Sequence, residues 1–394
     1  MEKITVTKQA VKKLRAGYPL LVKEDLTLDI EEDRFVQFFD GQQHFLGTGY
    51  LSKQNKGVGW LLTADNIKID HHFYVEKFVA ARSLRATFFQ DELTTAFRLF
   101  NGEGDGIGGV TVDFYAGYAV FSWYNAFIFA QKKAILSAFK VVFPEIIGIY
   151  EKIRFVSTDK NSVSKESSFV SGKEASEPLL VKENGVMYAT YLNEGLMTGI
   201  FLDQKNVRAE LVNGLAAGKT LLNMFSYTGA FSVAAAFGGS AQTTSVDLAK
   251  RSLEKTREQF LVNGIEPETQ KIYVMDVFGY FNYAKKKQLS YDVIVLDPPS
   301  FARNGKKTFS VAKNYGELVA SSVEILATNG LLIASTNAAN VTDKKFRQMV
   351  EQALKNKGVS FTIFQEEKLP SDFHVAKEFP EGNYLKVLFI NIKK

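Results

Sequence analysis

The fold is decided by the stretch Leu221-Leu222-Asn223-Met224-Phe225-Ser226-Tyr227-Thr228-Gly229-Ala230-Phe231. Its apolar first half is typical of a buried strand, and the residues after Gly229 begin a helix predicted over Ala230–Phe237. Gly229 allows the chain to turn tightly, so that backbone N–H groups can approach a ligand. A strand over Thr243–Asp247 and a helix over Ala249–Asn263 follow. The stretch therefore predicts an α/β fold.

The same alternation of strands and helices continues to the end of the chain. It builds a mostly parallel sheet with helices on both faces, and ligands of such sheets bind beyond the carboxyl ends of the strands. We expect this domain to span residues 191–394. Its further strands are predicted over Lys271–Met275, Tyr291–Asp297, Gly330–Ser335, Thr362–Lys368 and Tyr384–Ile392, and its further helices over Val277–Lys286, Gly316–Ala327 and Asp343–Lys357.

Polar residues stand at four of these strand ends. After the Asn223–Gly229 turn comes Asp247, followed by Leu248; its carboxylate suits two ribose hydroxyls. Asp276-Val277 is placed to meet an adenine edge, and Asp297-Pro298-Pro299-Ser300-Phe301 follows a buried strand. The prolines fix a rigid loop beside an aromatic ring on which a flat base could stack. A nicotinamide enzyme is disfavoured, because the first turn lacks Gly-x-Gly-x-x-Gly.

Two smaller regions precede this domain. Residues 1–72 read as a mostly β unit, with strands over Val22–Ile30 and Arg34–Asp40 between glycines (Gly41, Gly47, Gly49, Gly57 and Gly59). The basic amphipathic helix Lys8–Arg15 is compatible with a nucleic-acid-binding barrel and equally with a solvated lysine face.

Residues 73–190 read as α+β. Helices are predicted over Phe73–Phe89 and Ala130–Phe139, and a strand over Glu145–Ile153. The glycine cluster at 102–109 lacks the Gly-Lys-Ser/Thr ending of a phosphate loop, so we interpret it as a turn. Residues 157–177 are rich in serine and lysine, and we expect an exposed, mobile loop there.

Composition limits the function classes. Cysteine is absent, which excludes disulfides, thiolate metal sites and cysteine nucleophiles. The net charge of +5 permits an anionic partner such as RNA without requiring one. Met1–Ala10 is polar, and no apolar run approaches the ~20 residues that a membrane span needs. We therefore expect a cytoplasmic protein without a membrane partner.

As a set, the motifs resemble the bacterial 23S ribosomal RNA large-subunit methyltransferases, most closely the cytosine-C5 type with an N-terminal PUA domain. The likeness extends to Arg98–Gly106, Thr198–Lys205 and Pro380–Lys386. It implies a PUA-like domain (1–72), a central RNA-binding-like domain (73–190) and a class I S-adenosylmethionine (SAM)-dependent methyltransferase domain (191–394). The implied partner is RNA, 23S ribosomal RNA in particular, and a homodimer is left open.

The resemblance also implies the positions that hold SAM. Arg208 would face the methionine carboxylate, with a surface arginine as the alternative, and Asp297 would lie near the amino or sulfonium group. The full set is Phe201, Gln204, Arg208, Asn223, Phe225, Ser226, Tyr227, Thr228, Gly229, Asp247, Leu248, Asp276, Val277 and Asp297.

One position departs from the cytosine-C5 pattern. Thr336 stands where that family has its cysteine, and an alcohol is a far weaker nucleophile than a thiolate. Either the target is another atom, such as guanine N7 or an exocyclic amine, or the chain is a non-catalytic RNA-binding or assembly protein. The related guanine-N7 methyltransferases have an asparagine instead of the cysteine in this loop, and Asn337 fits that pattern. The candidate catalytic positions are Asp297, Pro298, Pro299, Phe301, Thr336 and Asn337. A late-loop residue, His374, is a candidate RNA contact or a solvated histidine.

Overall fold

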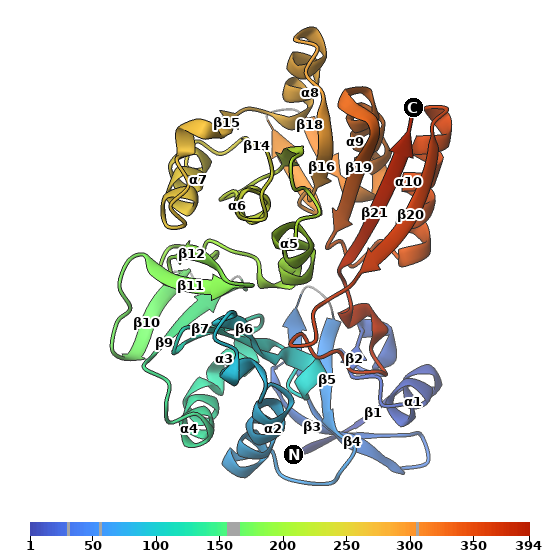
Figure 1. The fold of residues 1–394 in the computed structure, drawn as a ribbon. Coiled ribbons are helices and arrows are strands. Elements are labelled where there is room, and N and C mark those ends of the chain that lie inside the picture. Colours follow the sequence, from blue (N-terminus) through green and yellow to red (C-terminus); the bar gives the residue numbers. More distant parts are fainter. Residues whose placement is uncertain (30–31, 55–56, 156–165, 305–306) are drawn as a thin grey trace. The chain divides into compact units, whose positions relative to one another are not determined.

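The computed structural model describes residues 1–29, 32–54, 57–155, 166–304 and 307–394. The chain forms two compact units (Figure 1). The N-terminal unit comprises Met1–Leu179, Tyr191–Thr198 and Ser371–Gly382, and the C-terminal unit comprises Leu180–Thr190, Gly199–Pro370 and Asn383–Lys394. Two separate sheets lie in the N-terminal unit, and the boundary between them near residue 72 stays a prediction.

The first sheet has the strand order β1-β3-β4-β5-β2. The predicted basic helix is α1 (Lys8–Arg15), which begins at the N-cap Thr7 and buries Ala10 and Leu14 against this sheet's core. The strands are β1 (Glu2–Thr5), β2 (Leu20–Leu21), β3 (Arg34–Phe39), β4 (Phe45–Gln54) and β5 (Gly57–Thr63).

Two local predictions for this region are wrong. Lys23–Asp25 is a 3-10 turn rather than part of a strand. The Asp25 carboxylate accepts the backbone N–H of Val22 at 3.0 Å and forms an ion pair with Lys13 at 2.9 Å, which stabilises the turn. Ile30 lies outside the described residues. Gly49 lies inside β4 rather than in a turn: a Cβ there would be 2.1 Å from the carbonyl oxygen of Trp60.

The second sheet has the order β10-β9-β8-β7-β6 and packs against helices through an aromatic core. Phe78 illustrates this core, since its ring contacts those of Phe100, Phe139 and Phe143. The elements are α2 (His71–Leu84), η2 (Phe88–Gln90), β6 (Ala96–Asn101), η3 (Gly102–Asp105), β7 (Val110–Tyr115), β8 (Tyr118–Trp123), α3 (Ala126–Ala130), α4 (Lys132–Val142), β9 (Gly148–Ile153) and β10 (Ser167–Gly172).

The structure corrects two predictions here and agrees with a third. The helix predicted over Ala130–Phe139 is the pair α3 and α4, because Asn125 caps α3 by accepting the N–H of Ile128. The predicted mobile loop contains β10, which pairs with β9, whereas residues 157–165 lie outside the described part of the chain. The glycine cluster forms η3, a turn as predicted, and its Asp105 is buried in an ion pair with Arg85 at 2.7 Å.

The C-terminal unit is built on a seven-stranded sheet of order β15-β14-β13-β16-β19-β21-β20. The first five of these strands are parallel, and β21 pairs antiparallel with both of its neighbours, β19 and β20. The strands are β13 (Thr220–Met224), β14 (Gln242–Asp247), β15 (Lys271–Val274), β16 (Tyr291–Leu296), β19 (Leu326–Thr336), β20 (Ser360–Glu367) and β21 (Lys386–Lys393). Two hairpins, β11 (Leu179–Glu183) with β12 (Val186–Thr190) and β17 (Phe301–Asn304) with β18 (Lys307–Ser310), lie outside this sheet.

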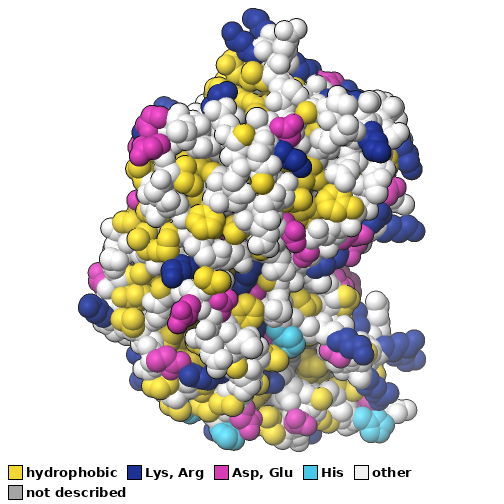
Figure 2. Space-filling model, in the orientation of Figure 1, with side chains coloured by type: hydrophobic (Ala, Val, Ile, Leu, Met, Phe, Trp, Pro, Cys, Tyr) yellow, Lys and Arg dark blue, Asp and Glu magenta, His cyan; other side chains and the backbone are white. Residues whose placement is uncertain are grey.

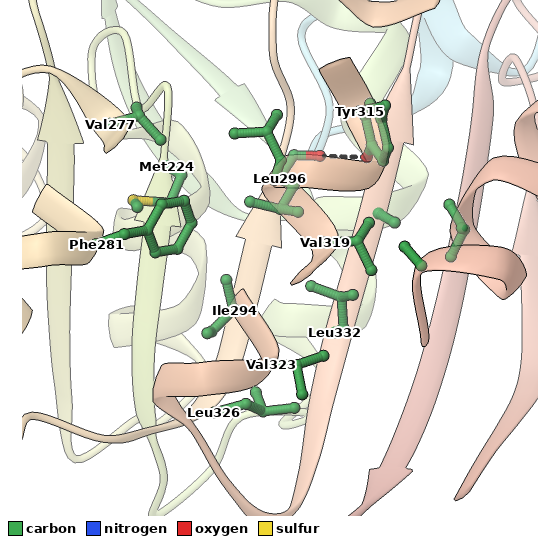
Figure 3. Packing of buried hydrophobic residues seen from close by; sticks show 14 of the residues in the cluster. Met224, Val277, Phe281, Ile294, Leu296, Tyr315, Val319, Val323, Leu326 and Leu332 are labelled. Atoms are coloured by element: carbon green, nitrogen blue, oxygen red, sulfur yellow. Dashed lines mark hydrogen bonds between the residues drawn. The ribbon is translucent and has the colours of Figure 1, made fainter. Parts of the chain in front are cut away.

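Helices cover both faces of the sheet, as the alternation predicts. Successive residues of β16 point to opposite faces: Ile294 and Leu296 join the core under α8, α9 and α10 (Figure 3), and Val293 and Val295 join the core under α5 and α6. The helical elements of this unit are η4 (Leu202–Gln204), α5 (Lys205–Val212), α6 (Ala230–Phe237), α7 (Ser252–Leu261), η5 (Pro267–Thr269), α8 (Val277–Lys286), α9 (Val311–Ile325) and α10 (Asp343–Asn356), whereas η6 (Pro380–Gly382) belongs to the N-terminal unit.

Charged side chains of both signs are interspersed on the face that Figure 2 draws, in keeping with the mild net charge of +5. Among the described residues, no helix has the length and apolar character that crossing a membrane requires.

Candidate active site at the carboxyl edge of the sheet

The turn after β13 has an unusual backbone. Phe225 and Tyr227 have φ of 60° and 52°, which non-glycine residues rarely adopt, and Gly229 has φ of 81°. Ser226 N–H donates to the carbonyl of Val246 at 3.0 Å, which ties the turn to β14. Positive φ values outside glycine concentrate at functional sites, so the turn is a strong candidate for ligand contact. The Asn223 side chain points away from it: the amide donates to Ser232 at 3.1 Å in the interior.

Asp247 orders this turn. Its two carboxylate oxygens accept the N–H groups of Tyr227 and Ala249, each at 2.8 Å, and its side chain stays half-buried. The neighbouring Leu248 is 50% exposed. A carboxylate has about four acceptor positions, so Asp247 keeps capacity for hydroxyl donors.

The next strand end carries the N-cap of α8. Asp276 accepts the N–H of Gly279 at 3.0 Å, and Val277 is buried. The ring of Phe278 lies 6.5 Å, centroid to centroid, from Phe309, which in turn lies 6.0 Å from Phe225. Three aromatic rings therefore gather near the ends of β13 and β15.

Asp297 lies at the end of β16 in an acidic, acceptor-rich setting. Gln204 Nε2 donates to Asp297 Oδ1 at 2.9 Å and to Ser335 Oγ at 2.7 Å. Burial, and next the charge of Asp203, raise the Asp297 pKa to about 6, although hydrogen bonds from Ser335 and Gln204 and the charge of Arg208 oppose the rise. Gln204 Oε1 is buried and has no hydrogen-bond partner in the described part of the chain.

Arg208 is not a surface residue. Its guanidinium is buried and donates to both carboxylate oxygens of Glu183, at 2.6 and 2.8 Å, and to the carbonyl of Phe201 at 2.7 Å. The alternative of a surface arginine is therefore wrong, whereas the predicted contact with a methionine carboxylate stays a prediction for a guanidinium that already pairs with Glu183. Phe201 itself is 40% exposed, and its ring lies 5.2 Å from that of Tyr227. Thr228 Oγ1 donates to the carbonyl of Gly199 at 2.6 Å.

Two loops meet beside Asp297. Ser300 Oγ donates to Asn337 Oδ1 at 2.9 Å, which joins the loop after β16 to the loop after β19. Pro298 is buried, whereas Pro299, Asn337 and Phe301 are exposed, Phe301 to 63%. Tyr315 links the ends of β16 and β19. Its hydroxyl lies 3.4 Å from the carbonyl of Leu296 (Figure 3) and 2.8 Å from the carbonyl of Ser335.

Thr336 does not line an open surface, contrary to the prediction. Its side chain is fully buried, and its hydroxyl accepts the N–H of Ala338 at 3.2 Å. His374 belongs to the N-terminal unit, where its Nδ1 lies 3.2 Å from the Asp105 carboxylate, which raises the histidine pKa. A catalytic role of Thr336 and an RNA contact of His374 stay predictions.

Three further residues belong to this edge that sequence reasoning did not single out. Glu183 neutralises Arg208, Asp203 acts on Asp297, and Phe309 completes the aromatic group. Only Asp203 lies inside a quoted motif, Thr198–Lys205, and could have been found from it. No cluster of three histidine, cysteine or acidic side chains suited to a metal ion occurs among the described residues.

A profile of S-adenosylmethionine-dependent methyltransferases matches residues 154–375, and a PUA-like domain profile matches residues 4–64. The chain belongs to the S-adenosylmethionine-dependent methyltransferase family. The first match spans the whole edge described above, from Glu183 to Asn337, and it confirms the predicted class I fold and its SAM dependence.

Relatives cover the full length of the chain. YwbD of Bacillus subtilis, named as a candidate ribosomal RNA large subunit methyltransferase, is 47% identical over 100% of both chains. Ribosomal RNA large subunit methyltransferase I of Aeromonas salmonicida is 28% identical over 90% of this chain and 89% of the relative. A solved structure of a candidate methyltransferase in complex with S-adenosylhomocysteine (SAH) matches this chain with a TM-score of 0.93 and 47% identity. The match covers 99% of this chain and 100% of the solved chain.

The hydrogen-bond acceptors at this edge of the methyltransferase fit SAM. The cofactor carries a sulfonium and an ammonium group, and both cations suit an edge where the charge of Asp203 helps to raise the pKa of Asp297. The orphaned acceptor Gln204 Oε1 suits an ammonium N–H, and Asp247 suits the ribose hydroxyls. SAM, when bound, supplies a methyl group activated by its sulfonium.

SAM affinity is expected to fall as the pH is lowered through about 6. In the folded, ligand-free chain the pKa of Asp297 is about 6, above its ordinary value of 3.8. The folded state therefore loses stability relative to the unfolded chain as the pH rises from about 4 to 6. A cationic ligand favours the ionised carboxylate, so it binds more weakly when Asp297 is protonated. Titration calorimetry in buffers of different ionisation enthalpy should detect proton release near pH 6. Equal dissociation constants at about pH 5.5 and 7.5 would contradict this linkage.

Proposed function

We propose that this protein methylates guanine N7 in ribosomal RNA of the large subunit, with SAM as the donor. The RNA class is supported by the names of two relatives, YwbD, matched over its full length, and the Aeromonas enzyme, matched over 89% of its length. The PUA-like match at residues 4–64 supplies a second domain that a small-molecule methyltransferase would leave unused.

The choice of a ring nitrogen depends on one observation: the chain has no cysteine, and the hydroxyl at the corresponding position is buried. Cytosine C5 requires prior attack on the ring by a strong nucleophile. Thr336 is fully buried and its oxygen already accepts the Ala338 N–H, so it does not reach a base. Guanine N7 has a free lone pair and needs only correct placement.

Methyl transfer to guanine N7 needs no general base. The N7 lone pair forms the new N–C bond, the S–C electron pair passes to sulfur, and the guanine ring keeps a positive charge with no proton released. Asp297 is thus not required as a proton acceptor; its carboxylate balances positive charge and accepts the Gln204 amide. The exposed residues of the two joined loops, Pro299, Ser300, Phe301 and Asn337, would form the base pocket together with Pro298.

On the cofactor side, the strained turn from Phe225 to Gly229 would face the nucleoside, with Asp247 at the ribose. Asp276 and Val277 would meet the adenine, Gln204 and Asp297 the methionine end, and Phe201 and Leu248 the rim. Arg208 contributes indirectly, since it fixes the carbonyl of Phe201.

The test is nucleoside mass spectrometry of 23S ribosomal RNA incubated with the protein and SAM, using RNA from a strain that lacks the protein. We expect 7-methylguanosine to appear, and borohydride reduction followed by aniline to cleave the RNA at one site. The appearance of 5-methylcytidine would overturn the choice of atom. SAM binding without transfer to any RNA would favour the rival function, a non-catalytic RNA-binding protein.

Phe309 to alanine is expected to weaken adenosine-moiety binding by about 1–3 kcal/mol, roughly 5- to 150-fold, because base–aromatic stacking has this magnitude. Calorimetry with 5′-methylthioadenosine, which lacks the amino acid, measures this contribution alone. The control is Phe364 to alanine, since Phe364 lies on β20 and is 45% exposed. Unchanged 5′-methylthioadenosine affinity in the Phe309 variant would place the adenine elsewhere.

A further inference from the structure

A buried lysine lies directly behind the loop that carries Asn337. Lys386 begins β21 and is the register partner of Thr336, the last residue of β19. Its side chain is 5% exposed, and Nζ donates to the carbonyl of Tyr384 at 2.6 Å and to the carbonyl of Ala338 at 3.2 Å. One ammonium group thus bridges the start of β21 and the loop after β19.

The stability of the strand does not explain a charge at this position. Burial lowers the Lys386 pKa, and the carboxylate of Asp343, which raises it, forms its own ion pair with Lys368 at 2.6 Å. The neighbours Leu385 and Val387 are apolar and fully buried. What the ammonium adds among these apolar neighbours is a pair of charge-assisted hydrogen bonds to main-chain carbonyls.

Those hydrogen bonds complete the fixation of a three-residue loop. Thr336 Oγ1 accepts the Ala338 N–H, Asn337 Oδ1 accepts the Ser300 hydroxyl at 2.9 Å, and the Ala338 carbonyl accepts Lys386 Nζ. Ala338 takes part in three such bonds, because its carbonyl also accepts the Val341 N–H at 3.1 Å, and Asn337, the exposed member, lies between two held neighbours. Without Lys386, that carbonyl would keep only the Val341 N–H and would lose its tie to the start of β21.

We propose that Lys386 is a positioning residue that fixes the Thr336–Ala338 loop, so that Asn337 stays against Ser300 in the base pocket. The inference rests on the proposed function, which places the target base at these two loops. Small displacements of a bound reactant reduce the rate of transfer strongly. Most of the proposed cofactor residues lie on other segments, and Gln204 contacts β19 through Ser335, which precedes the loop, so we expect SAM binding to change little.

The test compares Lys386→Met and Lys386→Arg with the wild-type protein, and Lys393→Met, at the exposed end of the same strand, is the matched control. For Lys386→Met, kcat for methyl transfer to ribosomal RNA should fall about 10- to 100-fold, with SAH affinity and KM for SAM within about twofold. Lys386→Arg, which keeps charged donors, should recover most of the rate, and Lys393→Met should match the wild type.

Hydrogen–deuterium exchange provides a readout that needs no catalysis. A peptide spanning 331–341 should exchange faster in Lys386→Met than in the wild type, the Arg variant or the Lys393 control. Unchanged exchange, unchanged kcat, or a loss of kcat that follows a loss of SAH binding would each overturn the proposal. The product of the wild-type protein, identified separately, decides the proposed function: a product other than 7-methylguanosine would refute that function and leave the comparison of variants valid.

Discussion

Replacement of Arg208 by methionine is expected to lower the free energy of unfolding of the C-terminal unit by about 3–5 kcal/mol, because it leaves the Glu183 carboxylate buried without its partner. The side chains of Arg208 and Glu183 are 2% and 0% exposed, and two hydrogen bonds of 2.6 and 2.8 Å join them. Burial of the Glu183 carboxylate and the loss of its charge partner both destabilise the folded state. The loss of stability therefore exceeds that of most single substitutions.

Urea unfolding of the full chain, followed by far-ultraviolet circular dichroism, measures this effect. The double variant Glu183→Gln with Arg208→Met removes both charges and should recover most of the lost stability, since a neutral amide is far less costly to bury. A single Arg208 variant within about 1 kcal/mol of the wild type would show that Glu183 is not held by this pair.

Replacement of Asp297 by asparagine is expected to weaken SAM binding by about 1.5–3 kcal/mol, roughly 10- to 150-fold, as for the loss of a hydrogen bond to a charged group. Asparagine keeps an oxygen for the Gln204 amide, which lies 2.9 Å from Asp297 Oδ1, so the pocket should keep its shape. The substitution should also abolish the pH dependence of SAM affinity near 6.

The SAM and SAH affinities of this variant separate two roles. SAH keeps the ammonium group and lacks the sulfonium charge, so a loss for SAM alone would place the carboxylate beside sulfur, and equal losses would place it beside the ammonium. Asp292→Asn is the matched control: Asp292 lies at the opposite end of β16 and accepts the Thr220 N–H at 2.8 Å. An Asp297 variant that binds both ligands as well as the control would remove Asp297 from the site.

Elements with a strong periodic pattern could be predicted from the sequence. The predicted bounds of α6 (Ala230–Phe237) and α8 (Val277–Lys286) agree with the structure, and Asp247 and Asp297 lie at the same edge of the sheet, at the ends of the two strands that flank β13. Both successes follow from geometry, because parallel strands place their carboxyl ends together.

The errors have a common physical origin in contacts between residues distant in sequence. Arg208 pairs with Glu183 on β11, 25 residues away, and no local pattern marks that carboxylate. Alternation over Val22–Ile30 predicts a strand, but Asp25 satisfies both Val22 and Lys13 in a 3-10 turn. The burial of Thr336 depends on the register between β19 and β21, which the sequence alone does not fix.

The most direct test of the account is a crystal structure of the protein with SAH. The account predicts the nucleoside at the turn from Phe225 to Gly229, its ribose at Asp247 and its amino-acid end at Gln204 and Asp297. A ligand bound at any other place, or contacts made without Asp247 and Asp297, would contradict the assignment of this edge as the methyl-donor site.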